Sequence, residues 1–410
     1  MTCFVLVESN TTGSGRLFCR AAVRAGLRPV LLARDPARYP YVREDRIEAR
    51  VVDTGSVDAV LAACAELGSP VAGVTSSSEY HVGTASEVAG RLGLPHPDPD
   101  AIRACRDKAT QRARLAAAGL PGPAFATARS PEAAADAAAA VGFPVVVKPV
   151  AGSGSIGVRR CGTRASAVAA AEAILAGTAG TGLPPQHTVL VEAYLAGAEL
   201  SVETFDDLVV GVTGKHLGPE PSFVETGHDF PAPVDPAVAA SVGEAAVAAL
   251  RALGLGWGAA HVELRLTGGG PRVVEVNPRL AGGMIPRMVE EATGIDLIAL
   301  LVARVAGGRP VPVPTRAGAA SIRFLVATSA GRLAGVGGVD AARQVPGVVE
   351  VGVTAREGQE VLVRGSFQDR LGYVLAADPG GDGAAAARAG DAALALLSPE
   401  LAPLVAEGRP

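Results

Sequence analysis

Two glutamates and one asparagine in the middle of the chain have the types and the spacing of a metal site. The stretch 261–277 alternates apolar and polar side chains around consecutive glycines, which predicts a β-hairpin. If its turn centres on Gly269, Glu263 lies opposite Glu275, and Asn277 shares their face. Facing carboxylates repel by roughly 3 kcal/mol at an effective dielectric of about 20, whereas a divalent cation between them attracts both. We expect a magnesium site here; the alternative is a shifted register with both acids in solvent.

Lysine is rare in this chain, so its positions carry information. Of the 37 basic side chains, all are arginines except Lys108, Lys148 and Lys215. A lysine that persists against this bias indicates a place where a compact point charge is needed and a planar guanidinium does not fit.

A loop rich in glycine and serine follows the second of these lysines. Residues 145–149 form an apolar strand with Lys148 near its end, and residues 152–157 read Gly-Ser-Gly-Ser-Ile-Gly. Glycines let backbone N–H groups approach phosphate oxygens and serines add donors, so the pattern indicates a phosphate-binding loop, with a flexible surface loop as the open alternative. It is not a P-loop, because the lysine precedes the glycines and the G-K-[ST] ending is absent.

Composition excludes several other classes of protein. The chain has 410 residues, 49% of them apolar and 19% charged, with a formal charge of -4, which indicates a soluble, mildly acidic protein of two or three domains. We therefore expect no nucleic-acid or membrane partner. The five cysteines form no CxxC pair, and the N-terminus lacks the basic segment of a signal peptide, so we expect reduced thiols and a cytoplasmic location.

The N-terminal segment alternates strands and helices. This order predicts an open parallel sheet with strands at 3–7, 29–33, 49–52 and 71–74, a turn at 12–15, and helices at 16–25 and 57–67. The glycines at 13 and 15 begin a dinucleotide-binding pattern, but Phe18 replaces its third glycine, so a simple strand-to-helix turn is favoured. The polar run 76–81 follows the last strand and is a candidate lining of the site.

The rest of the chain mixes strands and helices. We expect helices at 103–118, 131–141, 234–253 and 284–306, a strand at 189–195 that runs on through 199–203, a hairpin turn before 208–212, and a loop at 215–233. The last hundred residues read as strands at 321–327, 344–353 and 360–363 and a helix at 382–397, a unit with a packing role.

The order of these features resembles the ATP-grasp superfamily, and the likeness covers almost the whole chain. It is carried by Lys108, by Lys148 with its glycine loop, by the acids at 192 and 199, and by Glu263 with Glu275-Val-Asn277. The resemblance implies an α/β and α+β protein with the layout of biotin-carboxylase-like members. A Rossmann-like pre-ATP-grasp domain is expected at 1–97, an ATP-grasp domain at 98–310 with a lid at about 121–192, and a C-terminal α+β cap at 311–410.

The resemblance also implies a nucleotide site, residue by residue. The ATP phosphates are expected at Lys108, Lys148, Ser153, Gly154 and Ser155. The adenine is expected at a hinge strand formed by Glu192, Ala193, Tyr194 and Leu195. The ribose is expected at Glu199. An ordinary surface acid stays open for Glu199. Two Mg²⁺ ions, with Mn²⁺ as an alternative, are expected on Glu263, Glu275 and Asn277, with Arg279 as the cation beside the reacting phosphoryl group.

Within the superfamily the chain is most similar to the bacilysin-type L-amino-acid ligases and related carboxylate–amine ligases. The supporting motifs are Glu225-Thr-Gly-His228 and Asn277-Pro-Arg-Leu-Ala-Gly-Gly283. They imply an amino-acid pocket lined by Glu225, His228, Arg279, Gly282 and Gly283. Relatives can carry a bulky residue where this chain has Gly283, so we expect a more open acceptor pocket, which a Trp at this position narrows.

The function implied is ATP-dependent joining of a carboxylate to an amine through an acyl phosphate, with Lys148, Arg279 and His228 as the catalytic residues. For Glu225 and His228, a proton-accepting role and a structural hydrogen bond both stay open. A carboxylase, or a purine-pathway formate or bicarbonate ligase, is the alternative enzyme, and a non-catalytic nucleotide-binding protein is the alternative from another class. The expected partners are small molecules, and the sequence leaves a homodimer open.

Overall fold

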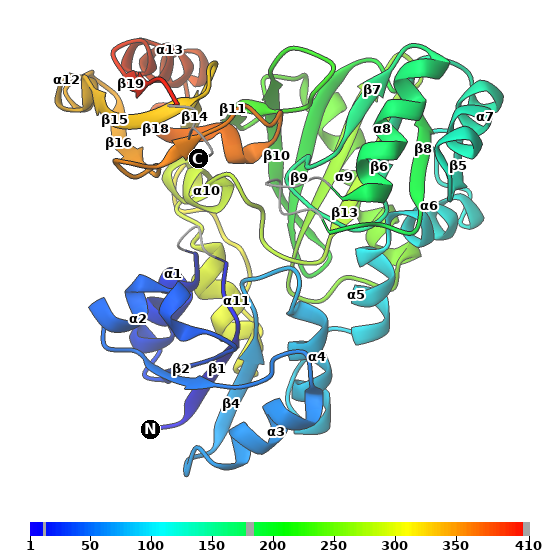
Figure 1. Ribbon diagram of the computed structural model, residues 1–410. Coiled ribbons are helices and arrows are strands. Elements are labelled where there is room, and N and C mark those ends of the chain that lie inside the picture. The colour runs from blue at the N-terminus through cyan, green and yellow to red at the C-terminus, as the bar shows by residue number, and fades with distance from the viewer. Residues whose placement is uncertain (11–13, 178–183, 405–410) are drawn as a thin grey trace, which may run out of the picture.

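The computed structural model of the protein describes residues 1–10, 14–177 and 184–404, which form three lobes (Figure 1). The lower lobe, blue in Figure 1, holds a parallel sheet in the order β3-β2-β1-β4, as the sequence predicts. Of the expected turn at 12–15, residues 12 and 13 lie outside the described residues. The lobe consists of β1 (Cys3–Val7), α1 (Ser14–Arg24), β2 (Arg28–Ala33), η1 (Pro36–Arg38), α2 (Pro40–Glu44), β3 (Glu48–Val51), α3 (Val57–Ala65), β4 (Val71–Thr75) and α4 (Val82–Arg91).

Two short helices, α5 (Pro99–Arg106) and α6 (Lys108–Ala117), lead out of this lobe. The single helix expected at 103–118 is wrong, because Asp107 between them has an extended backbone. Its carboxylate accepts a hydrogen bond from the N–H of Thr110 and so caps a new helix. Lys108 therefore lies in the first turn of α6.

The lid is a four-stranded antiparallel sheet in the order β5-β8-β6-β7. It consists of β5 (Phe125–Ala128), α7 (Pro131–Val141), β6 (Val145–Pro149), β7 (Arg159–Cys161), α8 (Arg164–Ala176) and β8 (Val189–Ala193). The alanine-rich helices α7 and α8 pack on this sheet. The strand expected to run from residue 189 to 203 is wrong, since β8 ends in the lid and β9 (Ala198–Phe205) belongs to another sheet.

The body of the protein is an eight-stranded antiparallel sheet in the order β13-β12-β9-β10-β11-β14-β18-β16. It adds to β9 the strands β10 (Leu208–Leu217), β11 (Glu225–Phe230), β12 (Ala259–Thr267), β13 (Gly270–Asn277), β14 (Ala319–Val326), β16 (Val348–Val353) and β18 (Arg370–Asp378). The loop expected at 215–233 is wrong, because β10 extends through Lys215 to Leu217 and residues 225–230 form β11.

Side-chain alternation gives this sheet an apolar and a polar face. Leu200, Val202, Val262 and Leu264 pack against helix α9 (Pro236–Ala252). Since successive side chains of a strand point to opposite faces, the residues between them face the other way, toward the lid. That second face holds Glu199, Ser201, Glu203, His261, Glu263 and Arg265.

The lower lobe and the body share one core. The single helix expected at 284–306 is wrong: α10 (Ile285–Thr293) ends at Gly294, which has φ +77, and Asp296 caps α11 (Leu297–Val305). Figure 1 shows these yellow helices running from the body down to the blue lobe. Ile298, Leu301 and Val302 of α11 pack in one cluster with Phe4 and Leu6 of β1.

The C-terminal residues complete the body sheet and form a second, smaller one in the order β17-β15-β19. The added elements are β15 (Gly331–Gly337), α12 (Val339–Arg343), β17 (Glu360–Val361), η2 (Phe367–Asp369), α13 (Gly383–Leu394) and β19 (Ser398–Ala402). Strands β15, β18 and β19 are not among those expected, and the strand expected from residue 344 begins only at Val348. The boundaries at 97 and 310 stay predictions, and β14 continues the body sheet across the second. Within the described ranges, no helix has the length and apolar character needed to cross a bilayer.

Candidate active site

The β12–β13 hairpin places Glu263 opposite Glu275 and His261 opposite Asn277, as the sequence predicts. The expected turn geometry is not observed: Thr267 pairs with Gly270, so only two residues connect the strands. The register then shifts between Glu263 and Leu264, which leaves one extra residue in β13. This β-bulge restores the pairing that a turn centred on Gly269 was expected to give.

Helix α6 holds the bulge in place. The guanidinium of Arg112 donates to the carbonyl oxygens of Val273 and Val274, both at 2.7 Å. The amide of Gln111 donates to the carbonyl of Val276 at 2.8 Å and accepts from its N–H at 2.9 Å. β13 is an edge strand, so these side chains pair backbone groups that no neighbouring strand reaches.

Each hairpin carboxylate has a lysine partner. Glu275 Oε1 lies 3.0 Å from Lys108 Nζ, and Glu263 Oε1 lies 2.9 Å from Lys215 Nζ. Burial opposes ionisation of Glu263, but Lys215 and His261 hold its pKa well below its ordinary value. The sequence predicts a metal ion that offsets the repulsion between the two carboxylates. In the structure, the ammonium groups of Lys108 and Lys215 already offset it.

Lys148 lies deeper in the same cleft. It is 4% exposed, and its Nζ lies 2.6 Å from Glu192, whose other oxygen lies 2.6 Å from Arg112. Burial lowers the pKa of Lys148, against the attraction of Glu192. Burial also opposes ionisation of Glu192, but Lys148 and Arg112 keep its pKa below the ordinary value. The Glu192 side chain thus orients Lys148, which sequence reasoning did not foresee.

The glycine loop covers the cleft between these lysines. Lys108 Nζ donates to the carbonyl oxygen of Gly152 at 2.8 Å, and its backbone N–H donates to Val150 at 2.8 Å. Ser153, Gly154 and Ser155 line the same cavity as Lys108 and Lys148. The loop therefore lies where the sequence places a phosphate cradle.

The expected hinge also lines this cavity, with Glu192, Ala193, Tyr194 and Leu195. Glu199 lines it too, and its side chain is 11% exposed, so it is not an ordinary surface acid. Arg265 at 2.8 Å and Lys215 at 3.4 Å hold its carboxylate. Burial raises its pKa, against the attraction of Lys215.

Lys215, which has no role among the sequence predictions, joins three carboxylates. Its ammonium lies 2.5 Å from Glu225, 2.9 Å from Glu263 and 3.4 Å from Glu199. Burial opposes its charge, but these acids raise its pKa well above the ordinary value. The rarity of lysine is the feature of the sequence that could have identified Lys215, because all three lysines of the chain lie in this site.

Arg279 connects the site to the lower lobe. Its guanidinium donates to Glu79 at 2.5 and 3.0 Å, and Glu79 also pairs with Arg106. Burial opposes its charge, whereas Glu79 raises its pKa. Glu79 lies in the polar run that follows β4, so that run does line the site.

Glu225 and His228 lie on β11, close to each other. Residues three apart in a regular strand face opposite sides, but a register shift between His216 and Leu217 inserts one residue into β11. Glu225 Oε2 therefore lies 3.6 Å from His228 Nε2. Arg370 of β18, 2.6 Å from Glu225, brings the C-terminal unit into the site.

His228 is a buried, neutral imidazole. Both of its ring nitrogens lack a hydrogen-bond partner among the described residues, and its ring packs edge-on against Phe324. Burial, chiefly, lowers its pKa to about 3. Gly283, with φ +58, lies against it: a Cβ there would be 2.7 Å from His228 Nε2.

This burial has a measurable consequence for stability. Since the folded pKa lies below the unfolded value of about 6.5, the unfolded state binds the proton first, and stability falls as pH drops from 6.5 toward 3. When the pH is lowered from 7 to 5, protonation of His228 in the unfolded state should reduce the free energy of unfolding of the natural protein by about 2 kcal/mol. The His228→Gln variant should lack this part of the reduction. Urea unfolding at both pH values measures this, with the exposed His96→Gln as control. Equal losses in the His228 variant and the natural protein would show that His228 is not held neutral.

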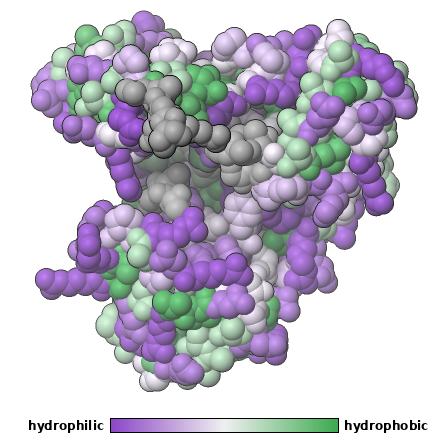
Figure 2. All heavy atoms as spheres, viewed as in Figure 1, coloured by the Kyte–Doolittle hydropathy of each residue, from purple (hydrophilic) through white to green (hydrophobic). Residues whose placement is uncertain are grey.

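Two cavities meet at the site. The first is the cleft described above, and the second, of about 560 Å³, extends from it into the lower lobe. On the face shown in Figure 2 the surface is hollowed between the lower lobe and the upper ones. The cavities share a wall formed by Ser153, Gly154, Glu225, Glu263, Arg279, Phe367 and Arg370.

The residues present fit magnesium and a nucleotide. Across the described chain, no three His, Cys, Asp or Glu side chains cluster as metal ligands, so the hairpin offers two carboxylates and the Asn277 amide. Mg²⁺ takes few protein ligands when phosphate oxygens complete its octahedron. Lys108 and Lys148 add the positive charge that phosphates require.

Comparisons with known proteins agree with this geometry. Residues 141–287 match the ATP-grasp domain, and residues 323–402 match the L-amino acid ligase C-terminal domain 2. The uncharacterised protein y4rH of Sinorhizobium fredii is 38% identical over 92% of this chain and 78% of its own length. Carnosine synthase 1 of Homo sapiens is 32% identical over 55% of this chain, which spans only 29% of that enzyme. The crystal structure of L-amino acid ligase from Bacillus licheniformis matches with a TM-score of 0.80 at 21% identity, covering 98% of this chain and 99% of the other.

The fold and the first matched domain define the class: the chain belongs to the ATP-grasp superfamily. Within it, the chain belongs to the L-amino acid ligase family, a group of ATP-dependent ligases that form carbon–nitrogen bonds. The resemblance drawn from the sequence is confirmed.

Proposed function

We propose that the protein joins the carboxylate of one amino acid to the amine of another, using ATP and releasing ADP and phosphate. The shared wall of the two cavities supports this most directly. A γ-phosphate held in the first cavity would face a carboxylate held in the second, with Arg279 beside both. The names of two matched proteins, a carnosine synthase and an L-amino acid ligase, agree with such a reaction.

The chain's own residues would position the reactants. Lys108 and Lys148 hold the phosphates, and a carboxylate oxygen of the first substrate attacks the γ-phosphorus as ADP leaves. Arg279 then stabilises the charge of the acyl phosphate. Two magnesium ions on Glu263, Glu275 and Asn277, or Mn²⁺ in their place, would supply further neutralisation of the phosphate oxygens.

The amine attacks the acyl carbon, phosphate leaves, and the proton that the nitrogen releases goes to the departing phosphate. A pKa of about 3 makes His228 a weak base, and its fully buried side chain lines neither cavity, so we assign it to shaping the pocket behind Glu225 and Gly283 and not to contact with the amine. Glu225 is held by Lys215 and Arg370, and their charges, against the effect of burial, keep its pKa below the ordinary value. It would attract the ammonium without taking its proton.

Incubation with Mg·ATP and pairs of proteinogenic amino acids, with phosphate release and product mass as readouts, tests the proposal. An amide product with ADP and phosphate is expected. AMP and pyrophosphate as products would overturn the acyl-phosphate route. ATP hydrolysis that requires bicarbonate or formate would favour the carboxylase and purine-pathway alternatives, and tight Mg·ATP binding without product would favour a non-catalytic protein.

The glycines at 282 and 283 are expected to set the size of the second substrate. A Trp at Gly283 must displace His228, so its effect combines two causes. Gly282 lines the second cavity, as Gly283 does, and a Cβ at Gly282 would meet no atom within 4 Å. We therefore expect Gly282→Trp to remove products with bulky second residues and to keep those with small ones, as product masses would show. An unchanged product range would place the acceptor elsewhere.

A further inference from the structure

The glycine loop of the lid rests on a residue from the C-terminal unit. Gly154 has φ +65, and a Cβ at this position would lie 2.2 Å from Cδ1 of Phe367. The backbone N–H of Phe367 donates to the carbonyl oxygen of Gly154 at 3.3 Å. The loop therefore approaches the ring so closely that only a glycine fits there.

The turn that carries Phe367 is firmly held. Asp369, 2% exposed, accepts hydrogen bonds from the N–H groups of Arg364 at 2.8 Å and Gly365 at 2.7 Å. Arg159 of the lid donates to the carbonyl oxygen of Arg364 at 3.4 Å, which makes a second contact between lid and turn. These hydrogen bonds fix the turn at 364–369, and the glycine loop packs against it.

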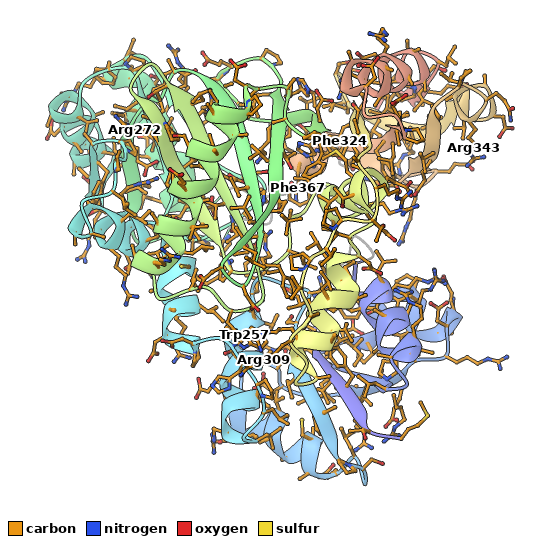
Figure 3. All side chains as sticks on the ribbon, turned by 180° about the vertical axis from the view of Figure 1, so that it is seen from behind. Trp257, Arg272, Arg309, Phe324, Arg343 and Phe367 are labelled. Atoms are coloured by element: carbon orange, nitrogen blue, oxygen red, sulfur yellow. The ribbon has the colours of Figure 1, made fainter. Side chains whose placement is uncertain are left out.

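Phe367 stands at the junction of the two cavities. Its side chain lines both, together with Gly154. Figure 3 shows it between the green strands of the body sheet and the orange C-terminal segment. Three residues later, Arg370 pairs with Glu225, so the same segment also reaches the amino-acid side of the site.

We propose that Phe367 is a positioning residue that holds the glycine loop closed over the reacting phosphate and keeps water from the acyl phosphate. The inference rests on the proposed function. Water that attacks an acyl phosphate returns the free carboxylate and phosphate, so ATP is consumed and no amide forms. An apolar ring against the loop excludes that water and slows loop opening.

The test compares Phe367→Ala with Phe367→Leu, which retains apolar contact. Val363→Ala is the matched control, since Val363 is an exposed apolar residue of the same segment, at 53% exposure. With the amino-acid pair that gives most product, the natural protein should release one phosphate per amide. In Phe367→Ala we expect this ratio to rise about tenfold and in Phe367→Leu to stay near one.

A second readout needs no amino acid. Dissociation of Mg·AMPPNP, followed by competition with ATP, should be several-fold faster in Phe367→Ala than in the natural protein and unchanged in Val363→Ala. If Phe367→Ala does not fold, Phe367→Val replaces it, because its shorter side chain gives up contact with the loop. Unchanged ratio and unchanged dissociation would overturn the role of Phe367. If no pair yields an amide, the proposed function fails, and the dissociation rate alone decides this inference.

Discussion

Glu275→Gln is expected to fold normally and to turn over ATP about 10²–10³-fold more slowly. The substitution keeps the shape of the side chain and removes the negative charge that faces Glu263 across the hairpin. That charge attracts a bound cation and the ammonium group of Lys108, which lies 3.0 Å away. ADP formation at saturating Mg·ATP and amino acids measures the loss, and thermal unfolding measures the fold.

Glu357→Gln is the control for this experiment. Glu357 is an exposed carboxylate between β16 and β17, so its loss should leave turnover unchanged. Normal turnover in Glu275→Gln would remove the hairpin from the catalytic site. A protein that unfolds would instead show that Glu275 serves the fold.

Lys148→Arg is expected to lower kcat/KM for ATP by about 10²-fold although the charge is kept. Lys148 is 4% exposed and lies 2.6 Å from Glu192, whose other oxygen is taken by Arg112. A planar guanidinium is larger and has no room beside that pair. Initial rates over a range of ATP concentrations give the ratio.

Two comparisons separate this effect from a general one. The exchange of an exposed arginine, Arg129→Lys, should leave the kinetics unchanged. Lys148→Met, which removes the charge, should be at least as impaired as Lys148→Arg. If Lys148→Arg were as active as the natural protein, the argument from the rarity of lysine would fail at this position.

Much of the fold could be predicted from sequence, because side-chain alternation and glycine turns act locally. The parallel sheet of the lower lobe and the pairing of Glu263 with Glu275 are confirmed. That pairing depends on two features which compensate, a two-residue turn and a bulge, and neither was foreseen. The bulge depends on Arg112, which lies on a helix far away in sequence.

The errors have local physical causes. Two expected helices are each split, one where Asp107 caps a new helix and one where Gly294 ends a helix before Asp296 caps the next. Both capping residues can be read in the sequence, but the apolar periodicity across them favours one continuous helix in each case. Polar side chains, Glu225 and His228 among them, favour a loop at this position, whereas the structure places them in strand β11, within the site.

The ion pairs between residues of the site could not be predicted, because the partners are distant in sequence. Glu79 and Arg279 are 200 residues apart. Arg370 and Glu225 are 145 residues apart, and no sequence motif around either residue indicates that the other is its partner. Only the folded protein brings such pairs together, so their roles follow from the geometry.

The continuous body sheet limits how such a protein can be recombined. A cut at residue 310 would separate β11 from β14, which are hydrogen-bonded neighbours, and would take Phe367 and Arg370 away from the residues they contact. The C-terminal hundred residues are therefore no detachable module. A chimaera that grafts them from another ligase would exchange part of the wall shared by the two cavities, and, under the proposed function, with it the choice of product.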